Sequence, residues 1–473
     1  MILVDITTKI IIKGLVQMRI VICGAGIVGS AIATHLAAEQ NDVTVIDIDE
    51  EKVQRIAEHA DLSAIVGLAS HPDVLERAGL DQAELIIAVT ESDEVNMVAC
   101  QMAHSVFKTP TKIARIRSNA YLRSDLSSRI FTEENMPIDF IISPEQEVAS
   151  AVSRQLRLPG AFDVKELGGG KIQLVGVLCD NNCPIIDTPL RHLTDLFPDL
   201  SITIVAILRE NLVTISRDGT DELKTGDRVY FVCDTDHLER AMAAFGHHEH
   251  RTSSIVVAGG GNIGQILAQD IESGQSDIKS KIIEVNKEQA RNIAAKLSNT
   301  SVICGDVLDA DILKEANVGS SETFVAVSND DEVNILSALL AKRIGAKYAV
   351  VLVNMQGFLP LISTLGVDVV INPPQITVSS VLEHIRRGSI IDVHSIVEGL
   401  GEVLEAEAIS GSDLVGLPLR KSRIPKGVTI GAVLRGEQVI PARGDTTIEV
   451  GDHVILFAKQ GKSRQAEKII SAK

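Results

Sequence analysis

The sequence predicts an α/β protein of two tandem modules, each a doubly wound parallel sheet followed by a small α+β lobe. Three observations lead to this prediction. The 473-residue chain is rich in aliphatic residues and poor in aromatic ones, which is typical of α/β layers. VICGAGIVGS (21–30) and VVAGGGNIGQ (256–265) both run from an apolar strand into the pattern G-x-G-x-x-G. Finally, segments of the first half recur in the second half, which indicates a tandem duplication.

The recurring segments come from both lobes of each module, and this sets the order of the lobes along the chain. In the first lobe, VTVIDID (43–49) matches SKIIEVN (280–286), and residues 64–99 match residues 302–338. In the second lobe, SITIVAILREN (201–211) matches GVTIGAVLRGE (427–437), and LKTGDRVYFV (223–232) matches IEVGDHVILF (448–457).

The repeat also gives the expected domain boundaries. We expect parallel-sheet lobes at 18–140 and 252–370, and α+β lobes at 160–244 and 387–471. Met18 directly precedes the first strand, so residues 1–17 are interpreted as an extension that is either disordered or a start-site artefact.

Short apolar strands alternate with amphipathic helices in the first lobe, and this alternation predicts parallel βαβ units. The α+β lobes instead show hairpin signals near RDGT (217–220) and ARGDTT (442–447). The predicted strands of the first lobe are 20–23, 43–47, 64–67, 85–90 and 112–117, and the predicted helices are 30–39, 50–59, 71–79 and 94–107.

The first glycine loop has the sequence context of a dinucleotide-binding (Rossmann) fingerprint. It follows a predicted strand and precedes a predicted helix, and the next strand ends in an acid, Asp47. Gly24 is expected to make the tight turn, Gly26 to admit the pyrophosphate, and Gly29 to pack helix against strand. Asp47 can accept bonds from ribose hydroxyls and disfavours a 2′-phosphate, which favours NAD or NADH. The predicted contact loop is Gly24, Ala25, Gly26, Ile27, Val28 and Gly29.

Ligands of such sheets bind beyond the carboxyl ends of the strands. This places Leu68 as an apolar wall for adenine, Thr90 and Glu91 after the fourth strand, and Arg115 as a cation for the phosphates. Arg117 either shares that role or is a solvated or interface cation. A degenerate lobe that binds nothing is the alternative for the whole site.

The second glycine loop has the same glycine spacing as the first, but the two arginines are replaced. It retains an acid, Glu284, and has Asp306 where the first site has Leu68, while Leu352 and Asn354 align with Arg115 and Arg117. We expect weaker phosphate binding or a different nucleotide there, and a structural relic is the alternative. The predicted loop is Gly259, Gly260, Gly261, Asn262, Ile263 and Gly264.

The composition argues against two kinds of partner. A net charge of −18 argues against nucleic acid or an anionic lipid surface as a direct partner. The six cysteines lie mostly in apolar runs, which indicates reduced core thiols and a cytoplasmic location. Cys179 and Cys183 are interpreted as a structural pair in a turn, and GHHEH (246–250) as a linker.

Two acidic clusters, ESDEVN (91–96) and NDDEVN (329–334), are interpreted as helix caps and not as metal sites. The sequence shows no nucleophile elbow, P-loop lysine or H-E-x-x-H motif. It also offers no acid–base residue placed against a nicotinamide. We therefore expect no catalytic site, no bound metal, and nucleotide loops that act as sensors.

GAGIVG with VIDID, then AVTESDEVNMVACQMA, ARIRS and IISPEQ, resembles the regulator-of-potassium-conductance (RCK) module. Two such modules in one chain resemble the peripheral subunits of bacterial Trk potassium-uptake systems, over nearly the whole chain from Met18. The resemblance implies a regulatory protein that binds NAD(H), with ATP or ADP as further candidates, above all at the second site. It also implies a homo-tetramer or other ring on the cytoplasmic face of the inner membrane, gating a membrane potassium-transporting subunit.

Two other functions remain open from sequence. One is an NAD-dependent oxidoreductase of double form, and the other is a nucleotide-sensing regulator without a channel partner. The proline-containing segments 143–148 and 372–378 are predicted to be hinges that relay the nucleotide state.

Overall fold

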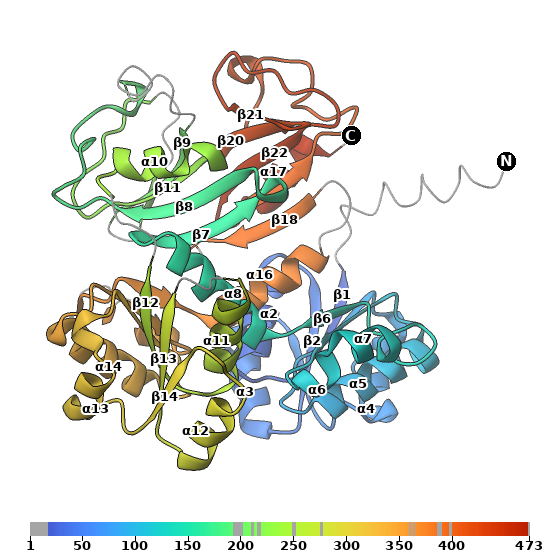
Figure 1. The fold of residues 1–473 in the computed structure, drawn as a ribbon. Helices are drawn as coiled ribbons and strands as arrows, with labels where there is room; N and C mark the ends of the chain where they lie inside the picture. Colours follow the sequence, from blue (N-terminus) through green and yellow to red (C-terminus); the bar gives the residue numbers. More distant parts are fainter. Residues whose placement is uncertain are drawn as a thin grey trace. The chain divides into compact units, whose positions relative to one another are not determined.

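The computed structural model describes residues 18–192, 202–209, 212–214, 219–247, 252–274, 278–358, 361–362, 365–385, 390–396 and 400–471. The predicted extension, residues 1–17, lies outside this set. Figure 1 shows the ribbon coloured along the sequence. The chain forms two compact units. The first unit comprises Met1–Glu147 with Pro373–Gly388, and the second comprises Val148–Asn372 with Ser389–Lys473.

The first Rossmann lobe is a six-stranded parallel sheet with the strand order β3-β2-β1-β4-β5-β6. The apolar runs 20–23 and 85–88 form the central strands and are buried because helices cover both faces of the sheet. The predicted strands are confirmed, and β6 adds a sixth. The elements are β1 (Arg19–Cys23), α2 (Ile27–Ala38), β2 (Asp42–Asp47), α3 (Glu50–His59), β3 (Ser63–Val66), α4 (Pro72–Arg77), η2 (Leu80–Gln82), β4 (Leu85–Ala88), α5 (Asp93–Met102), η3 (Ala103–Phe107), β5 (Thr111–Arg115), α6 (Asn119–Leu122), α7 (Ser124–Ile130) and β6 (Phe140–Ile142).

Two helix predictions in this lobe need correction. Helix α2 begins at Ile27, before the predicted start at Ser30, because the glycine loop leads directly into the first helical turn. The helix predicted over 94–107 is α-helical only to Met102 and continues as one π-helical turn, η3. It stops at Lys108, which has a left-handed backbone (φ 59°).

The second Rossmann lobe repeats the first, with the order β14-β13-β12-β15-β16-β17. Helices again lie on both faces of this sheet (Figure 1), and Phe324 is fully buried in its core. The elements are β12 (Ser254–Ala258), α11 (Asn262–Gly274), β13 (Lys279–Glu284), α12 (Lys287–Ala294), β14 (Ser301–Cys304), α13 (Ala310–Glu315), η7 (Val318–Ser320), β15 (Thr323–Ala326), α14 (Asp331–Ile344), β16 (Tyr348–Leu352), η8 (Gln356–Phe358) and β17 (Val369–Ile371).

The helices that follow the two Rossmann sheets are exchanged between the units. These are α8 (Pro144–Arg157) and α16 (Pro373–Ile385). Helix α16 belongs to the first unit, where it packs on α2 and places the His384 ring 4.3 Å from the Phe140 ring. From Val148 onward α8 belongs to the second unit, where the Leu156 carbonyl accepts a bond from the Thr252 N–H at 3.3 Å. The predicted module boundaries did not anticipate this exchange.

Each α+β lobe is a five-stranded antiparallel sheet, in the orders β10-β9-β11-β8-β7 and β18-β19-β22-β20-β21. The first contains β7 (Ala161–Leu167), η4 (Gly168–Gly170), β8 (Ile172–Leu178), η5 (Leu190–His192), β9 (Ile202–Arg209), β10 (Leu212–Thr214), β11 (Arg228–Asp234), η6 (Thr235–His237) and α10 (Leu238–Ala244). The second contains β18 (Ile390–Ser395), β19 (Gly401–Glu407), η10 (Leu419–Lys421), β20 (Val428–Arg435), β21 (Gln438–Pro441), β22 (His453–Lys459) and α17 (Ser463–Ile470).

The hairpin predicted near 442–447 lies elsewhere. Strands β20 and β21 pair through a turn at Gly436 and Glu437, where Gly436 has φ 59°. A two-residue loop favours glycine with positive φ, so the RGEQ segment was the stronger signal. Of the other predicted hairpin turn, residues 217 and 218 lie outside the described residues.

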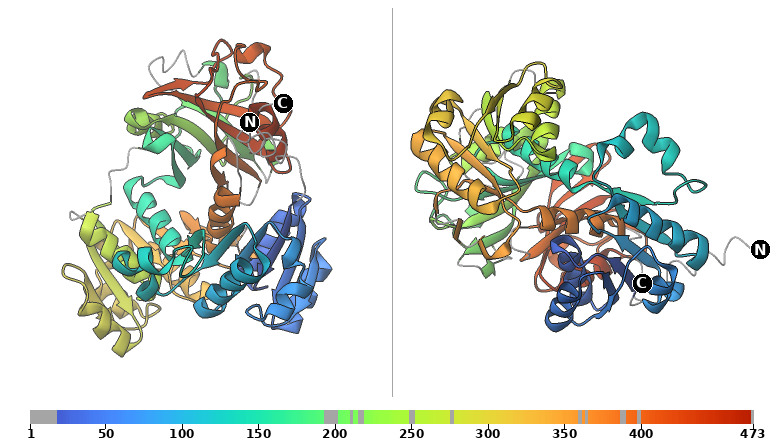
Figure 2. Two further views of the ribbon diagram at one scale, coloured as in Figure 1. Left: turned by 90° about the vertical axis from the view of Figure 1, so that its right-hand side faces the viewer. Right: turned by 90° about the horizontal axis from the view of Figure 1, so that it is seen from below.

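The two α+β lobes share one hydrophobic core within the second unit. Tyr230 and Phe457, one from each lobe, are fully buried in it, and Figure 2 shows the two lobes together in green and orange-red. Two ion pairs join the matching strands β7 and β18: His394 lies 3.0 Å from Asp163, and Lys165 lies 2.8 Å from Asp392.

Five of the six cysteines are buried free thiols, as the apolar runs predict, and Cys304 is exposed. Cys179 and Cys183 are both buried in the core of the first α+β lobe. Among the described residues, no helix is both long and apolar enough to span a membrane.

Candidate functional site

The first glycine loop depends on two glycines for its shape. Gly24 has φ 111°, and its N–H donates to the Ile46 carbonyl at 2.7 Å. A Cβ on Gly29 would lie 1.9 Å from the Gly24 carbonyl oxygen. Both positions therefore require glycine, as the fingerprint predicts.

The third glycine of the loop faces open space. No atom of the described residues lies within 4 Å of a Cβ built on Gly26. Gly26 is also the N-cap of α2, which has no side-chain cap and no acid in its first turn. Helices α3 and α5, by contrast, are capped by Asp49 and Ser92. The first N–H groups of α2 are thus left for an anion.

Asp47, at the end of β2, holds the loop in place. One carboxylate oxygen accepts the Ala25 N–H at 2.6 Å, and the other accepts the Asp49 N–H at 2.9 Å. Each oxygen keeps a second lone pair for a ligand hydroxyl. The side chain is half-buried at the carboxyl edge of the sheet, and the adjacent Ile48 is exposed.

The other predicted residues lie at the same edge of the sheet. Leu68 follows β3 and is half-buried, and the exposed Ile27 begins α2. Thr90 follows β4 and donates from its N–H and its hydroxyl to Asn96 Oδ1, at 2.9 and 2.7 Å. Glu91 is exposed beside it.

Two side chains hold the ends of β4 and β5 together, and this role was not predicted from the sequence. The Asn96 side chain is fully buried and donates to the Arg115 carbonyl at 2.9 Å, which ties the end of β4 to the end of β5. The Asp93 carboxylate accepts the Arg117 N–H at 3.0 Å and the Ser118 N–H at 2.9 Å. The predicted capping role belongs to Ser92, which accepts the Val95 N–H at 3.2 Å.

Two arginines lie on either side of one glutamate at the end of β5. Glu145, from the start of α8, lies 2.9 Å from Arg117 Nε and 3.8 Å from Arg115 Nη2. Burial lowers the pKa of Arg115 below its ordinary value, and Glu145 opposes that shift, so the guanidinium stays charged. Arg115 Nε is buried and has no hydrogen-bond partner among the residues that the structure describes. Glu145 is a third residue at this edge that sequence reasoning missed.

The second glycine loop has the same backbone. Gly259 has φ 109°, and a Cβ on Gly264 would lie 2.1 Å from the Gly259 carbonyl oxygen. In the described part of the chain, a Cβ on Gly261 would meet no atom within 4 Å. Glu284 accepts the Gly260 N–H at 2.8 Å and the Asn286 N–H at 2.8 Å, as Asp47 does in the first site.

The supporting residues of the second site also repeat. Asn334 is fully buried and donates to the Leu352 carbonyl at 3.0 Å, and Asp331 accepts the Asn354 N–H at 3.0 Å. These bonds confirm that Leu352 and Asn354 occupy the positions of Arg115 and Arg117. Asp330 caps α14 through the Val333 N–H at 2.9 Å.

The surroundings of the second loop differ from those of the first. Gln265 and Gln289 donate their side-chain amides to the Gly260 carbonyl at 3.1 and 3.2 Å. Asn262 and Asp306 are exposed, and Ile263 is half-buried. Strand pairing matches Ile371 with Ile142, so Pro374 stands where the first site has Glu145.

Comparison with known proteins gives the family. The TrkA-N domain model matches residues 20–144 and 255–373, and the TrkA-C domain model matches residues 174–246 and 403–471. The chain belongs to the TrkA family. A Trk system potassium uptake protein TrkA from Azorhizobium caulinodans is 48% identical over 452 residues, which cover 96% of this chain and 98% of the relative. The TrkA of Halomonas elongata is 40% identical and covers 93% of this chain and 95% of its own.

Membership of the TrkA family confirms the resemblance stated from sequence. The relatives are named as potassium-uptake proteins and not as enzymes, in agreement with the expected lack of catalysis. Among solved structures, the GsuK RCK domain gives a TM-score of 0.59 at 15% identity, covering 97% of this chain and 96% of that one. The GsuK channel bound to NAD gives 0.58 at 15% identity, covering 97% of this chain and 80% of that one. At this identity the likeness confirms the tandem RCK fold.

Proposed function

We propose that this chain is the nucleotide-sensing regulatory subunit of a Trk-type potassium-uptake system, and that its first glycine loop is the main sensor. The observation that carries the proposal is the first loop itself. An uncapped helix start at an open Gly26 lies at the same sheet edge as Asp47 and Arg115. Family membership and a solved RCK-fold channel bound to NAD support the proposal.

The first site offers one group for each part of NADH. The pyrophosphate would lie on the first turn of α2 at Gly26, because the N–H groups and the helix dipole favour an anion there. Asp47 would accept the adenosine ribose hydroxyls and oppose a 2′-phosphate. The exposed Ile48 and half-buried Leu68 offer apolar contacts for adenine. Arg115 would face the phosphates, with Thr90 and Glu91 beside the nicotinamide half.

The second site would bind a nucleotide more weakly or bind a different one. Its glycine spacing is the same and Glu284 takes the place of Asp47, but the positions of the two arginines hold Leu352 and Asn354. Its proposed contacts are residues 259–264, Glu284 and Asp306, and ATP and ADP remain candidate ligands there.

Regulation would require several sites acting together. One ligand site typically couples about 1–3 kcal/mol to a second site, whereas moving a gate from 1:99 to 99:1 takes about 5.5 kcal/mol. A ring of chains, for which we propose a homo-tetramer, would supply enough sites on the cytoplasmic face of the membrane subunit. The segments 143–148 and 372–378, where α8 and α16 begin, would relay the nucleotide state as hinges.

Thermal unfolding with NADH, NAD, NADPH, ADP and ATP tests the proposal, with NADH absorbance followed in parallel. NADH should raise the melting temperature more than NADPH, and it should not be consumed. Potassium flux through vesicles that hold the Trk membrane subunit should then change when this chain and NADH are added together. Steady NADH oxidation with a substrate would instead indicate the oxidoreductase. Stabilisation by NADH without any effect on flux would indicate a sensor with another partner.

A further inference from the structure

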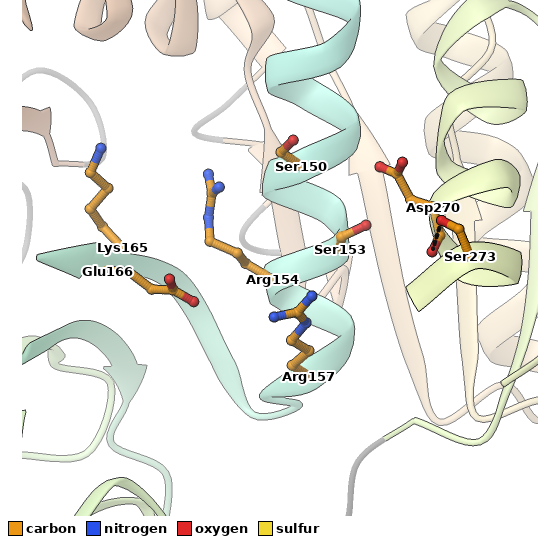
Figure 3. Close-up of a pocket in the computed structure, with 8 residues that line it drawn as sticks. All are labelled: Ser150, Ser153, Arg154, Arg157, Lys165, Glu166, Asp270 and Ser273. Carbon is orange, nitrogen blue, oxygen red and sulfur yellow. Dashed lines mark hydrogen bonds between the residues drawn. The ribbon is translucent and has the colours of Figure 1, made fainter. Parts of the chain in front are cut away.

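We propose that a cleft in the second unit, separate from both glycine loops, binds a small phosphorylated polyol such as a sugar phosphate. The cleft has a volume of about 410 Å³ and lies between α8, β7 and α11. It is large enough for a small molecule. Figure 3 shows side chains from all three elements lining it. This inference does not depend on nucleotide binding at the glycine loops.

The cleft holds two arginines, and the acids near them, Asp163 beside Arg154 and Glu166 in the cleft lining, lie beyond ion-pair distance. Arg154 and Arg157 lie one helical turn apart on α8. Within the described part of the chain, neither forms an ion pair at 4.0 Å or less, whereas Lys165 is paired with Asp392. Arg154 lies close enough to Asp163 to help lower the pKa of that carboxyl, against the effect of burial. In a chain of net charge −18, two such guanidinium groups in one cleft favour a doubly charged oxyanion.

Two polar groups of the cleft wall are buried and unsatisfied. Ser153 is only 7% exposed, and neither its hydroxyl nor Arg154 Nε has a hydrogen-bond partner among the described residues. Buried polar atoms are nearly always paired, so both are expected to bond to something in the cleft. A ligand with several oxygens would satisfy both.

The two halves of the cleft suggest a ligand with two different ends. Figure 3 shows Arg154 reaching from α8 toward the side of β7, where Glu166 and Lys165 lie, with Arg157 one turn further along the helix. Ser153 is turned the other way, toward Asp270 on α11. A phosphate would lie against the arginines. A hydroxylated body would bond to Ser153 and Asp270, because a carboxylate accepts from hydroxyls and repels a second phosphate.

The second copy of this arrangement lacks the same chemistry. Strand pairing at β6 and β17 places Leu382 of α16 at the position of Ser153, and the Leu382 side chain is buried. His394 stands in place of Lys165. Among the described residues the proposed site therefore occurs once, and the repeat offers Ser153→Leu as a natural blocking substitution.

Titration calorimetry of the full-length chain with ribose 5-phosphate and with inorganic phosphate tests the proposal. A G26D/G261D variant removes phosphate binding at the glycine loops without crowding, since a Cβ has free space at both positions. We expect one ribose 5-phosphate per chain in the wild type and in this variant, with the same affinity. No binding, or binding that is lost in the loop variant, would overturn the proposal.

Two substitutions of exposed cleft residues are expected to change the affinity for ribose 5-phosphate in opposite directions. Arg157→Gln should weaken ribose 5-phosphate binding about tenfold, because a charge-assisted hydrogen bond is lost. Glu166→Gln should tighten it about two- to fivefold, because a like charge is removed. Both residues are exposed, so neither change should impair folding. Arg240→Gln, on α10 outside the cleft lining, is the matched loss of charge and should have no effect.

The blocking substitution addresses the polyol end. Ser153→Leu should abolish binding of ribose 5-phosphate, and the milder Ser153→Ala should weaken ribose 5-phosphate while leaving inorganic phosphate unchanged. Equal behaviour of Arg157→Gln and Arg240→Gln, or an unchanged affinity in Glu166→Gln, would contradict the assignment.

Discussion

In the first Rossmann lobe β5 ends at Arg115, and in the second lobe the matching strand β16 ends at Leu352. Around these two positions the backbone is the same. Asn96 and Asn334 bond to the strand ends, and Asp93 and Asp331 bond to the N–H groups that follow. The glycine loops are also alike, with matching φ angles at Gly24 and Gly259.

The charged residues at the end of the fifth strand differ between the two lobes as a group. Arg115, Arg117 and Glu145 form one cluster in the first lobe, and their positions hold Leu352, Asn354 and Pro374 in the second. Losing only the glutamate would leave two neighbouring like charges, of which Arg115 is largely buried, and losing only the arginines would leave a buried acid without its ion-pair partners. The comparison separates residues that build the loop, which both lobes keep, from residues that set its charge, which only the first lobe has.

The largest expected effect tests the part that both lobes share. Gly29→Ala and Gly264→Ala should each destabilise the protein by about 3–5 kcal/mol, because the new methyl group would overlap a backbone carbonyl. Chemical denaturation of both variants measures this. An effect at one position and none at the other would show that the loops are not the same scaffold.

Asn96→Ala and Asn334→Ala should come next. Each removes a fully buried amide that holds two strand ends together, so we expect a loss of about 2–3 kcal/mol in both lobes. Denaturation curves measure the loss, and Gln101→Ala on the same helix α5 is a half-buried control with an expected change below about 1 kcal/mol. An unchanged stability of Asn96→Ala would mean that the strand ends are held by other contacts.

The α+β lobes extend the comparison, because there the two copies pair with each other. Burial raises the pKa of Asp163, but His394 and Tyr230 more than offset it, so the pKa lies below the ordinary value for this carboxyl. Its contribution to stability is therefore present above about pH 4 and is lost as the pH falls through the lowered pKa.

Asp163→Asn should accordingly lower the stability by about 1–2 kcal/mol at pH 7. The difference from the wild type should shrink below about pH 4. Melting temperatures from pH 7 to pH 3 measure this, and a difference that grew toward low pH would contradict the sign.

The smallest expected effect concerns Arg115, one of the charged residues that differ between the two lobes. Arg115→Leu gives the first site the residue that the second site has at this position and should weaken NADH binding about tenfold. The stability should change little, because Glu145 keeps Arg117 at 2.9 Å. Fluorescence titration with NADH measures the affinity. Equal affinities in the variant and the wild type would remove Arg115 from the site.

The sequence was sufficient for the parts of the site that are local. Glycine spacing and the acid at the end of the next strand predicted the loops, since strand, turn and helix follow one another directly. Asn96 and Asp93 were taken only for parts of a helix cap, because their partners lie on β5, far along the chain. Glu145 was missed for the same reason.

Contacts between segments far apart in the chain could not be predicted from the periodicity of apolar residues. The exchange of α8 and α16 between units depends on which surface each helix face contacts, and an amphipathic pattern does not name its partner. The hairpin turn at Gly436 was misplaced because ARGDTT carries more turn-forming residues than RGEQ, although only the latter joins two paired strands.

Calorimetric titration of NADH into the wild type, Gly26→Asp and Gly261→Asp tests the central claim most directly. Both substitutions place a carboxylate where the phosphates would lie, and neither crowds the loop. We predict that Gly26→Asp abolishes the tighter NADH binding, while Gly261→Asp leaves it intact. Tight NADH binding that survives Gly26→Asp, or that is lost only in Gly261→Asp, would contradict the assignment of the first loop as the sensor.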